Sequence, residues 1–281
     1  MKKLGLIAGE GELPAIIARN ASQRGREIVV ISLCEEIDPE VMSVASCIHR
    51  VGFDEVARVA ELLQAEGVSE VAMIGKVWRK TAYRPDVEEA VEEIANQETD
   101  RADTSLLAAF VKNLGQAGIG VANQLEYLGD AVPEAGVLGH LEPSPAEWED
   151  ISFGFKKAKA ISKAGIGQTV VVRNLSVVAV EAAEGTDEAI RRAGRLARGC
   201  VVVKVAWQDQ DRRFDIPTVG PDTISVMLAA GAGVLAIEAG GTIMVRREDT
   251  VAFADEAGIP VVAVGEVETL EDNDKRRGSI R

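Results

Sequence analysis

Short segments that are almost wholly apolar alternate with longer segments of helical character through the first half of the chain. The apolar segments lie at residues 4–8, 28–33 and 71–74. The helical segments lie at residues 13–23, 54–66 and 105–116. Strands that are apolar on both faces are typical of parallel sheets covered by helices on both sides. We therefore predict an α/β fold with a parallel sheet in the N-terminal half.

Prolines and glycines interrupt this alternation near residue 135. Residues 133–145 contain three prolines and two glycines, a composition typical of a domain boundary. A chain of 281 residues is long enough for two domains. The segments that we predict are an N-terminal domain over 1–132, a linker over 133–146, a C-terminal α/β domain over 147–265 and a polar tail over 266–281.

The C-terminal domain is also predicted to combine strands with helices. A first helix carries Lys156, Lys157, Lys159 and Lys163, which we expect on a solvated face. Valine-rich runs on both sides of residues 173–176 predict a β-hairpin. Further helices are predicted at about 186–198, 222–230 and 247–257, and further strands at about 200–205, 234–237, 242–245 and 260–264.

Charge and hydropathy exclude several classes of protein. The formal net charge of −14 argues against a nucleic-acid-binding protein, which needs a cationic surface. The longest uncharged apolar stretch, residues 224–237, is too short to span a bilayer. The N-terminal segment meets Glu10 too early for a secretory signal. We expect a cytoplasmic location.

The residue inventory also limits the metals that the chain can bind. Cys34, Cys47 and Cys200 show no Cys-x-x-Cys spacing, which argues against a disulfide framework and a thiolate zinc site. The two histidines, His49 and His140, are expected to be isolated and non-catalytic. A bound metal is therefore expected to be held mainly by oxygen atoms, which favours Mg²⁺ or Mn²⁺.

The turn after the first predicted strand contains two glycines, Gly9 and Gly11. Two glycines between a strand and a helix allow the backbone to approach a phosphate at the helix N-terminus. The third glycine of the dinucleotide-binding fingerprint is missing, and Glu10 and Glu12 would repel a bare phosphate. A ligand-binding turn and a tight turn without a ligand are both left open.

Acidic residues that end predicted strands have two interpretations. In the segment of residues 181–188, Thr186 is suited to cap the following helix and Asp187 to interact with its positive end. Alternatively, an acidic residue of this segment binds Mg²⁺ or orients a water molecule. Glu238, which also follows a predicted strand, either faces the same ligand-binding cleft as the segment 181–188 or is an ordinary turn acid.

Residues 210–220 concentrate charge immediately before a proline. Asp211 and Asp215 lie within five residues together with Arg212 and Arg213, and Pro217 follows. Charged residues at such a strand end are typical of the mouth of a site. The alternative is a solvated polar loop with a local Asp–Arg pair.

Five segments of the chain, taken in order, resemble a known enzyme family. They are residues 5–14, 167–168, 180–187, 210–220 and 238–240. Together they resemble the UDP-2,3-diacylglucosamine pyrophosphatases of lipid A biosynthesis, the magnesium-dependent family that is unrelated to the calcineurin-like phosphoesterases. The resemblance covers about residues 3–264. It implies a Rossmann-like N-terminal domain, a C-terminal catalytic domain of its own type and a ligand chamber between them.

The resemblance also implies a reaction and a set of site residues. Water attacks the α-phosphorus of UDP-2,3-diacylglucosamine, giving UMP and 2,3-diacylglucosamine 1-phosphate. Asp215 matches the family's metal-linked aspartate, and Asp187 matches a second conserved-motif aspartate that we treat as catalytic. The residues expected to bind substrate are Gly9, Gly11, Leu13, Gln168, Thr186, Lys204, Gln210, Arg213 and Thr218. The chain departs from the family pattern at Trp207-Gln208, where a Lys-Pro pair is expected.

This function implies Mg²⁺ as the cofactor, with Mn²⁺ as a substitute, and a lipid-linked nucleotide sugar as the partner. It implies transient contact with the cytoplasmic face of the inner membrane, as a peripheral protein, and no nucleic acid. The oligomeric state is left open, with a homodimer among the alternatives. The competing hypothesis is a non-catalytic nucleotide-sugar or dinucleotide sensor built on Gly9 and Gly11.

Overall fold

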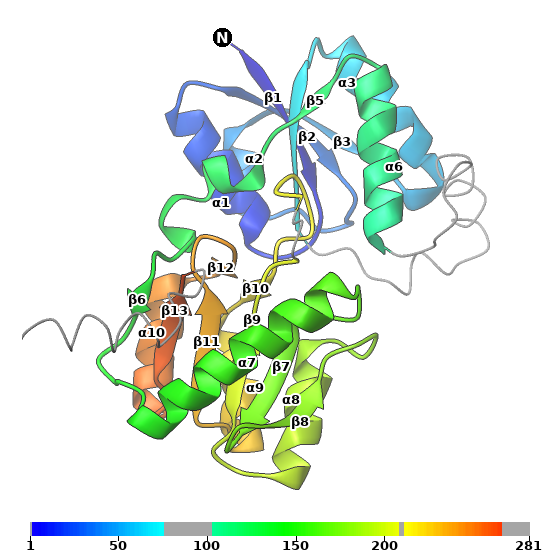
Figure 1. Cartoon of the computed structure of the whole chain (residues 1–281). Coiled ribbons are helices and arrows are strands. Elements are labelled where there is room, and N and C mark those ends of the chain that lie inside the picture. The colour runs from blue at the N-terminus through cyan, green and yellow to red at the C-terminus, as the bar shows by residue number, and fades with distance from the viewer. Residues whose placement is uncertain (1, 76–102, 208–210, 266–281) are drawn as a thin grey trace, which may run out of the picture. The chain divides into compact units, whose positions relative to one another are not determined.

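The chain folds into two compact units in the computed structural model, which describes residues 2–75, 103–207 and 211–265 (Figure 1). The N-terminal unit comprises Met1–Gly129 and Asp211–Asp215, and the C-terminal unit comprises Asp130–Gln210 and Ile216–Arg281. The residues of the second unit therefore flank a short segment that belongs to the first. The tail predicted over 266–281 lies outside the described residues, and the expected ligand chamber stays a prediction.

Five parallel strands form the sheet of the N-terminal unit, in the order β3-β2-β1-β4-β5. Their bounds are β1 (Lys3–Ala8), β2 (Glu27–Ser32), β3 (Ala45–Arg50), β4 (Glu70–Ile74) and β5 (Gly120–Val121). The predicted parallel sheet is confirmed. Strand β3 was missed because it mixes polar and apolar residues, a composition that a sheet edge tolerates.

Helices cover both faces of this sheet (Figure 1). Leu63 of α3 and Leu114 of α6 are fully buried in one core cluster with Val29, Ile31 and Val71 of the sheet. Helix α1 packs on the other face, against β1 and β2. The helices are α1 (Leu13–Gln23), α2 (Pro39–Val44), α3 (Val59–Ala65) and α6 (Asp103–Gln116), with the 3₁₀ helices η1 (Phe53–Arg58), η2 (Gln124–Tyr127) and η3 (Gly129–Ala131).

The C-terminal unit is built on a mixed sheet in the order β6-β13-β11-β9-β7-β8. Strands β9, β11 and β13 are parallel to one another, whereas β6, β7 and β8 pair antiparallel. Their bounds are β6 (Gly136–Val137), β7 (Thr169–Arg173), β8 (Ser176–Val180), β9 (Val201–Lys204), β11 (Val234–Glu238) and β13 (Val261–Val264). A separate parallel pair joins β10 (Thr218–Val219) to β12 (Ile243–Met244).

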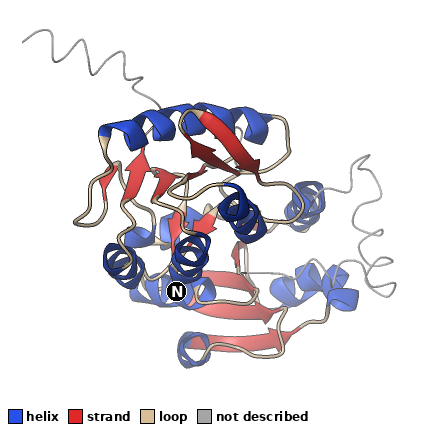
Figure 2. Ribbon diagram, turned by 90° about the horizontal axis from the view of Figure 1, so that it is seen from below, coloured by secondary structure: helices blue, strands red, loops and turns tan. Residues whose placement is uncertain are grey.

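Helices also lie on both sides of the C-terminal sheet (Figure 2). Because side chains alternate along a strand, Val203 of β9 packs with Phe155 of α7, whereas its neighbour Val202 packs with Ile190 of α8 and Met227 of α9. The helices are α7 (Pro145–Lys163), α8 (Thr186–Leu196), α9 (Pro221–Ala230) and α10 (Arg247–Glu256). None of the helices in the described part of the chain is both long and apolar enough to cross a membrane.

Local sequence explains where two of these elements begin. Ser144 and Glu147 form a reciprocal capping box at the start of α7, and Pro145 occupies the first turn, where its missing N–H is not needed. The predicted hairpin is confirmed as β7 and β8. Its turn residues Asn174 and Leu175 both have positive φ, and the buried Asp150 carboxylate accepts hydrogen bonds from their N–H groups.

Candidate functional site

Four side chains meet where β9 ends and α8 begins. We call Thr169, Glu181, Thr186 and Lys204 the Lys204 cluster. Lys204 Nζ donates a hydrogen bond to Thr186 Oγ1 at 2.8 Å, and Thr186 Oγ1 donates one to Glu181 Oε1 at 2.9 Å. Thr169 is paired with Lys204 across the β7–β9 ladder, and its hydroxyl oxygen lies 3.4 Å from that of Thr186. Because Lys204 is only 8% exposed, its positive charge is weakly screened by solvent.

One polar atom of this cluster and one of the neighbouring residue Gln168 lack partners among the described residues. In the part of the chain that the structure describes, neither Glu181 Oε2 nor Gln168 Nε2 makes a hydrogen bond, although both atoms are buried. Buried polar atoms in folded proteins are nearly always paired. A ligand bound here could supply a donor to Glu181 and an acceptor to Gln168. The Lys204 cluster thus combines a buried cation, two hydroxyls and a carboxylate, a set that suits an oxygen-rich ligand offering both hydrogen-bond donors and acceptors.

Close backbone contact holds the two loops of this region together. A Cβ atom added to Gly167 would lie 2.2 Å from the carbonyl oxygen of Glu181, closer than any side chain can approach. Gly167 precedes Gln168, so the same contact fixes the position of Gln168 relative to Glu181. Only glycine fits at residue 167.

Replacing Gly167 with alanine is expected to lower the free energy of unfolding by about 1–3 kcal/mol, the usual cost of overpacking. Gly115→Ala is the matched control, since an added Cβ there meets nothing within 4 Å. Gly115 lies within α6, so this change is expected to stabilise the protein by about 0.5–1 kcal/mol. Urea denaturation of both variants measures the difference, and equal stability of the two would contradict the contact with Glu181.

An ion pair with a buried carboxylate lies at the end of β11. Both oxygens of Glu238 are 2.7 Å from Lys159 Nζ, and Oε2 also accepts a hydrogen bond from the N–H of Ala206 at 2.8 Å. The expectation that Lys159 lies on a solvated face is wrong, because its ammonium group pairs with this buried carboxylate. These contacts join the end of β11 to α7 and to the backbone at residue 206.

The start of α8 corrects the capping interpretation. The N-cap residue is Gly185, with φ of 83°, and Thr186 is the first helical residue. Thr186 therefore does not cap the helix, and its hydroxyl instead joins Lys204 to Glu181. Asp187 is exposed in the first turn, where the helix dipole favours a negative charge.

The glycine turn of the N-terminal unit is confirmed as a tight connection between β1 and α1. Gly11 has φ of 99°, and the N–H of Gly9 donates to the carbonyl oxygen of Ile74 at 2.8 Å. A Cβ atom on Gly75 would lie 2.6 Å from the carbonyl carbon of Gly9, so this turn packs directly on the end of β4. Leu13 is the first residue of α1.

The charged segment before Pro217 is anchored in the N-terminal unit. Phe214 is buried in the same core cluster as Ile7 and Met73, and the N–H of Gln124 donates to the carbonyl oxygen of Arg212 at 2.9 Å. The hydrophobic side chain in the middle of the segment therefore fixes the charged residues on either side. The sequence pattern gave no sign that Phe214 has this role.

A local Asp–Arg pair, one of the two alternatives for this segment, is present. Arg213 Nε donates to Asp211 Oδ1 at 2.9 Å, and a second guanidinium nitrogen lies 2.6 Å from Oδ2. This pairing lowers the pKa of Asp211 and raises the pKa of Arg213. Arg213 is thus oriented by Asp211. Asp215 is exposed and has φ of 52°, a left-handed conformation that aspartate tolerates better than most residues.

Two further substrate-binding candidates lie close to this segment in sequence. Thr218 begins β10, and its hydroxyl donates to the carbonyl oxygen of Ile216 at 3.1 Å. Gln210, like Gln208 of the Trp-Gln pair, lies outside the described residues.

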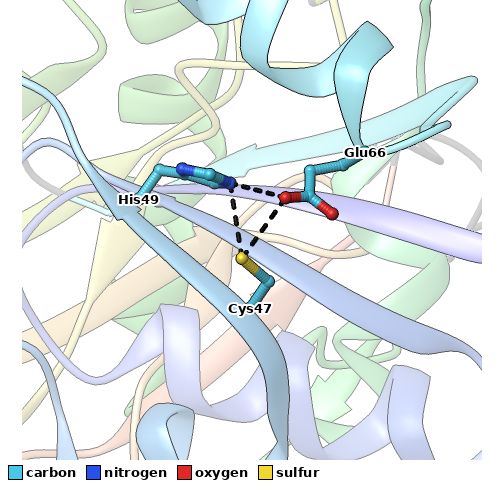
Figure 3. Close-up of side chains that lie close together, drawn as sticks. All are labelled: Cys47, His49 and Glu66. Atoms are coloured by element: carbon cyan, nitrogen blue, oxygen red, sulfur yellow. Dashed lines mark hydrogen bonds and ion pairs between the residues drawn. The ribbon is translucent and has the colours of Figure 1, made fainter.

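A cluster that the sequence analysis missed joins Cys47, His49 and Glu66 (Figure 3). The expectation that His49 is isolated is wrong, since its Nε2 lies 2.9 Å from Glu66 Oε1 and 3.3 Å from Cys47 Sγ. Partial desolvation and the hydrogen bond to Glu66 raise the pKa of the Cys47 thiol. The pKa of Glu66 is lowered, chiefly by its hydrogen bond with His49. Alternation along β3 places Cys47 and His49 on one face, a signal that depends on recognising this strand.

Comparisons with known proteins cover nearly the whole chain. The family models "LpxI N-terminal domain" and "LpxI C-terminal domain" match residues 3–131 and 134–262. The "UDP-2,3-diacylglucosamine pyrophosphatase LpxI" of Caulobacter vibrioides is 33% identical over 276 residues, which is 94% of this chain and 98% of that protein. The "Bifunctional purine biosynthesis protein PurH" of Bacillus subtilis is 34% identical over 130 residues, 44% of this chain and 22% of that protein.

A comparison with solved structures adds little to this. The UDP-glucose-4-epimerase of Stenotrophomonas maltophila aligns over 52% of this chain and 40% of its own, with 16% identity and a TM-score of 0.29. That agreement is too low to bear on function. The two family models and the full-length relative do bear on it, because they match both units and the segments singled out in the sequence. The chain belongs to the LpxI family.

Proposed function

We propose that this protein hydrolyses UDP-2,3-diacylglucosamine to UMP and 2,3-diacylglucosamine 1-phosphate in lipid A biosynthesis. The observation that carries the proposal is the 33% identity to the Caulobacter pyrophosphatase, which extends over 98% of that protein. A match of this extent leaves no unit of the relative without a counterpart here. In this proposal the protein acts as a peripheral protein and takes its substrate from the cytoplasmic face of the inner membrane.

The Lys204 cluster is the proposed binding site for a phosphate group. A diphosphate carries its charge on several oxygens, and its hydrolysis depends mainly on positioning and charge neutralisation. Lys204 supplies a buried positive charge, and Thr186 supplies a hydroxyl beside it. Gln168 is the residue before Thr169 of the cluster, and its buried Nε2 atom offers an unused N–H donor. These groups bind the anion and orient it, without forming a covalent intermediate.

Asp215 is the proposed residue for Mg²⁺, with Mn²⁺ as a substitute. Its carboxylate is a hard oxygen donor, which fits Mg²⁺, and the buried Phe214 fixes the backbone that carries it. Such an ion supplies charge neutralisation to the diphosphate oxygens and orientation to water. Arg213, held by Asp211, presents a positive charge two residues away.

The proposed reaction is an in-line displacement by water. Water attacks the α-phosphorus, the bond from that phosphorus to the bridging oxygen breaks, and the sugar phosphate leaves with the bridging oxygen. Asp187 is the proposed group that orients the water and takes its proton. One oxygen atom from water therefore ends on UMP.

Hydrolysis in ¹⁸O-labelled water with Mg²⁺ is expected to yield UMP carrying the label and unlabelled 2,3-diacylglucosamine 1-phosphate, as measured by mass spectrometry. EDTA is expected to stop the reaction and added Mg²⁺ to restore it. Label on the sugar phosphate would reverse the attacked phosphorus. A folded protein that binds UDP-sugars but releases no UMP would instead support the sensor hypothesis.

A further inference from the structure

We propose that Cys47, His49 and Glu66 form a binding site for a divalent transition metal of the Zn²⁺ class on the N-terminal unit. This trio, the Cys47 site, is distinct in chemistry from the proposed Mg²⁺ residue Asp215. Figure 3 shows the three side chains pointing toward one another, two from strand β3 and one from the end of helix α3. The proposal does not depend on the catalytic function.

The donor atoms have the spacing of metal ligands. Cys47 Sγ, His49 Nε2 and Glu66 Oε1 form a triangle with sides of 3.3, 2.9 and 3.4 Å. With bonds of about 2.3 Å to sulfur and about 2.0–2.1 Å to nitrogen and oxygen, a tetrahedral zinc ion holds its ligands roughly 3.3–3.6 Å apart. Shifts of a few tenths of an ångström would therefore convert the hydrogen-bonded triangle into a coordination site.

The arrangement differs from a nucleophilic triad. In a triad the imidazole uses one nitrogen for the nucleophile and the other for the carboxylate, so that a proton can pass along the chain. Here a single nitrogen, His49 Nε2, lies next to both Cys47 Sγ and Glu66 Oε1. Three donors that converge on one point suit an ion, whereas a proton relay needs them in line.

The fold holds each ligand in place. Cys47 and His49 are two residues apart on an edge strand and so project on the same face. Glu66 is the C-cap residue of α3, and its other carboxylate oxygen lies 3.7 Å from Lys3 Nζ, which also donates to the Glu66 backbone carbonyl at 2.7 Å. Outer contacts of this kind orient a metal-binding carboxylate. Lys3 also lies 3.6 Å from Glu27, which offsets part of its charge.

The ligand types and their accessibility select the metal. Thiolate and imidazole ligands with one carboxylate favour Zn²⁺, whereas Mg²⁺ requires oxygen ligands. The His49 and Glu66 side chains are each 27% exposed, so an ion can reach them from solvent. Binding would displace the thiol proton of Cys47 to solvent, and water would complete the coordination. The bound ion would tie the edge strand β3 to the end of α3.

Co²⁺ serves as a spectroscopic substitute for Zn²⁺ in the test. Full-length protein stripped with EDTA is titrated with Co²⁺, and a thiolate-to-cobalt charge-transfer band is expected to saturate at one ion per chain. Zn²⁺ is expected to displace the cobalt and to raise the melting temperature. Cys47→Ser is expected to abolish the band, while Cys34→Ser, at another half-buried cysteine, and Asp215→Asn retain it.

Two further variants test the remaining ligands. His49→Gln and Glu66→Gln are each expected to weaken Zn²⁺ binding by at least about 10–100-fold. Removal of an outer-sphere partner already has an effect of this size, and these two residues are proposed as direct ligands. Zn²⁺ is also expected to protect Cys47, but not Cys34, from alkylation, as read by peptide mass spectrometry. Absence of the band in the native protein, its persistence in Cys47→Ser, or equal alkylation of both cysteines with and without Zn²⁺ would overturn the proposal.

Discussion

Lys204→Met is expected to lower kcat/KM for UDP-2,3-diacylglucosamine by about 10²–10³, the usual effect of removing one preorganised group that stabilises developing charge. The effect is large because Lys204 is buried, so that solvent screens its charge weakly. Methionine keeps an unbranched side chain of similar length and fits irregular apolar space. The variant therefore removes the charge and the hydrogen bond to Thr186 while it preserves most of the packing.

Lys156→Met is the matched control, because Lys156 is exposed on α7 and takes no part in the Lys204 cluster. It is expected to leave kcat/KM unchanged. Steady-state release of UMP measures both variants, and far-ultraviolet circular dichroism and thermal melting check that both fold. A folded Lys204→Met protein with native kcat/KM would remove the Lys204 cluster from the reaction.

Apolar runs predicted the strands of both units well, because the buried strands are apolar on both faces. Residues 71–74 and 234–237, for example, correspond to β4 and β11. Four strands at sheet edges, β3, β5, β6 and β10, escaped prediction because an edge strand needs neither an apolar run nor regular length. The helix expected over 54–66 is present but begins as the 3₁₀ helix η1.

Thr186 and Lys204 were candidates from the sequence and Glu181 lay in the segment 181–188, but Thr169 was missed and the contacts among the four were not visible. Thr186 looked like a helix cap because a threonine before an acidic turn commonly is one. Gly185 takes that position instead, and the Thr186 hydroxyl reaches Lys204 and Glu181. The preference of threonine for the helix-capping position competes here with the contacts that Thr186 makes with residues of the sheet. No pattern within a single segment reports those contacts.

The contacts among Cys47, His49 and Glu66 were not visible in the sequence. Motif spacing reports only neighbours along the chain, whereas Glu66 lies 17 residues from His49 and reaches it through the packing of α3 on the sheet. The alternation of Cys47 and His49 would have shown a shared face once β3 was recognised. The third ligand depends on tertiary structure.

The other large effect is expected at Asp215. Asp215→Asn removes the negative charge with which the proposed ligand would bind Mg²⁺, so kcat is expected to fall by about 10²–10⁴, within the range that loss of one essential catalytic group causes. Asparagine is the informative replacement because it tolerates φ of 52° at least as well as aspartate. The backbone of the segment and the burial of Phe214 are therefore expected to survive, and the melting temperature to stay close to that of the native protein.

Asp211→Asn separates the loss of a metal ligand from a general loss of charge in this segment. That change weakens the pairing that orients Arg213 but leaves Asp215 intact, so activity is expected to fall less and to keep its native dependence on Mg²⁺ concentration. Asp215→Asn, in contrast, is expected to need far more Mg²⁺ for any residual turnover. Titrations of UMP release against Mg²⁺ concentration compare the two. An unchanged Mg²⁺ requirement in Asp215→Asn would place the ion elsewhere, since a carboxylate that does not bind the metal has no reason to alter its affinity.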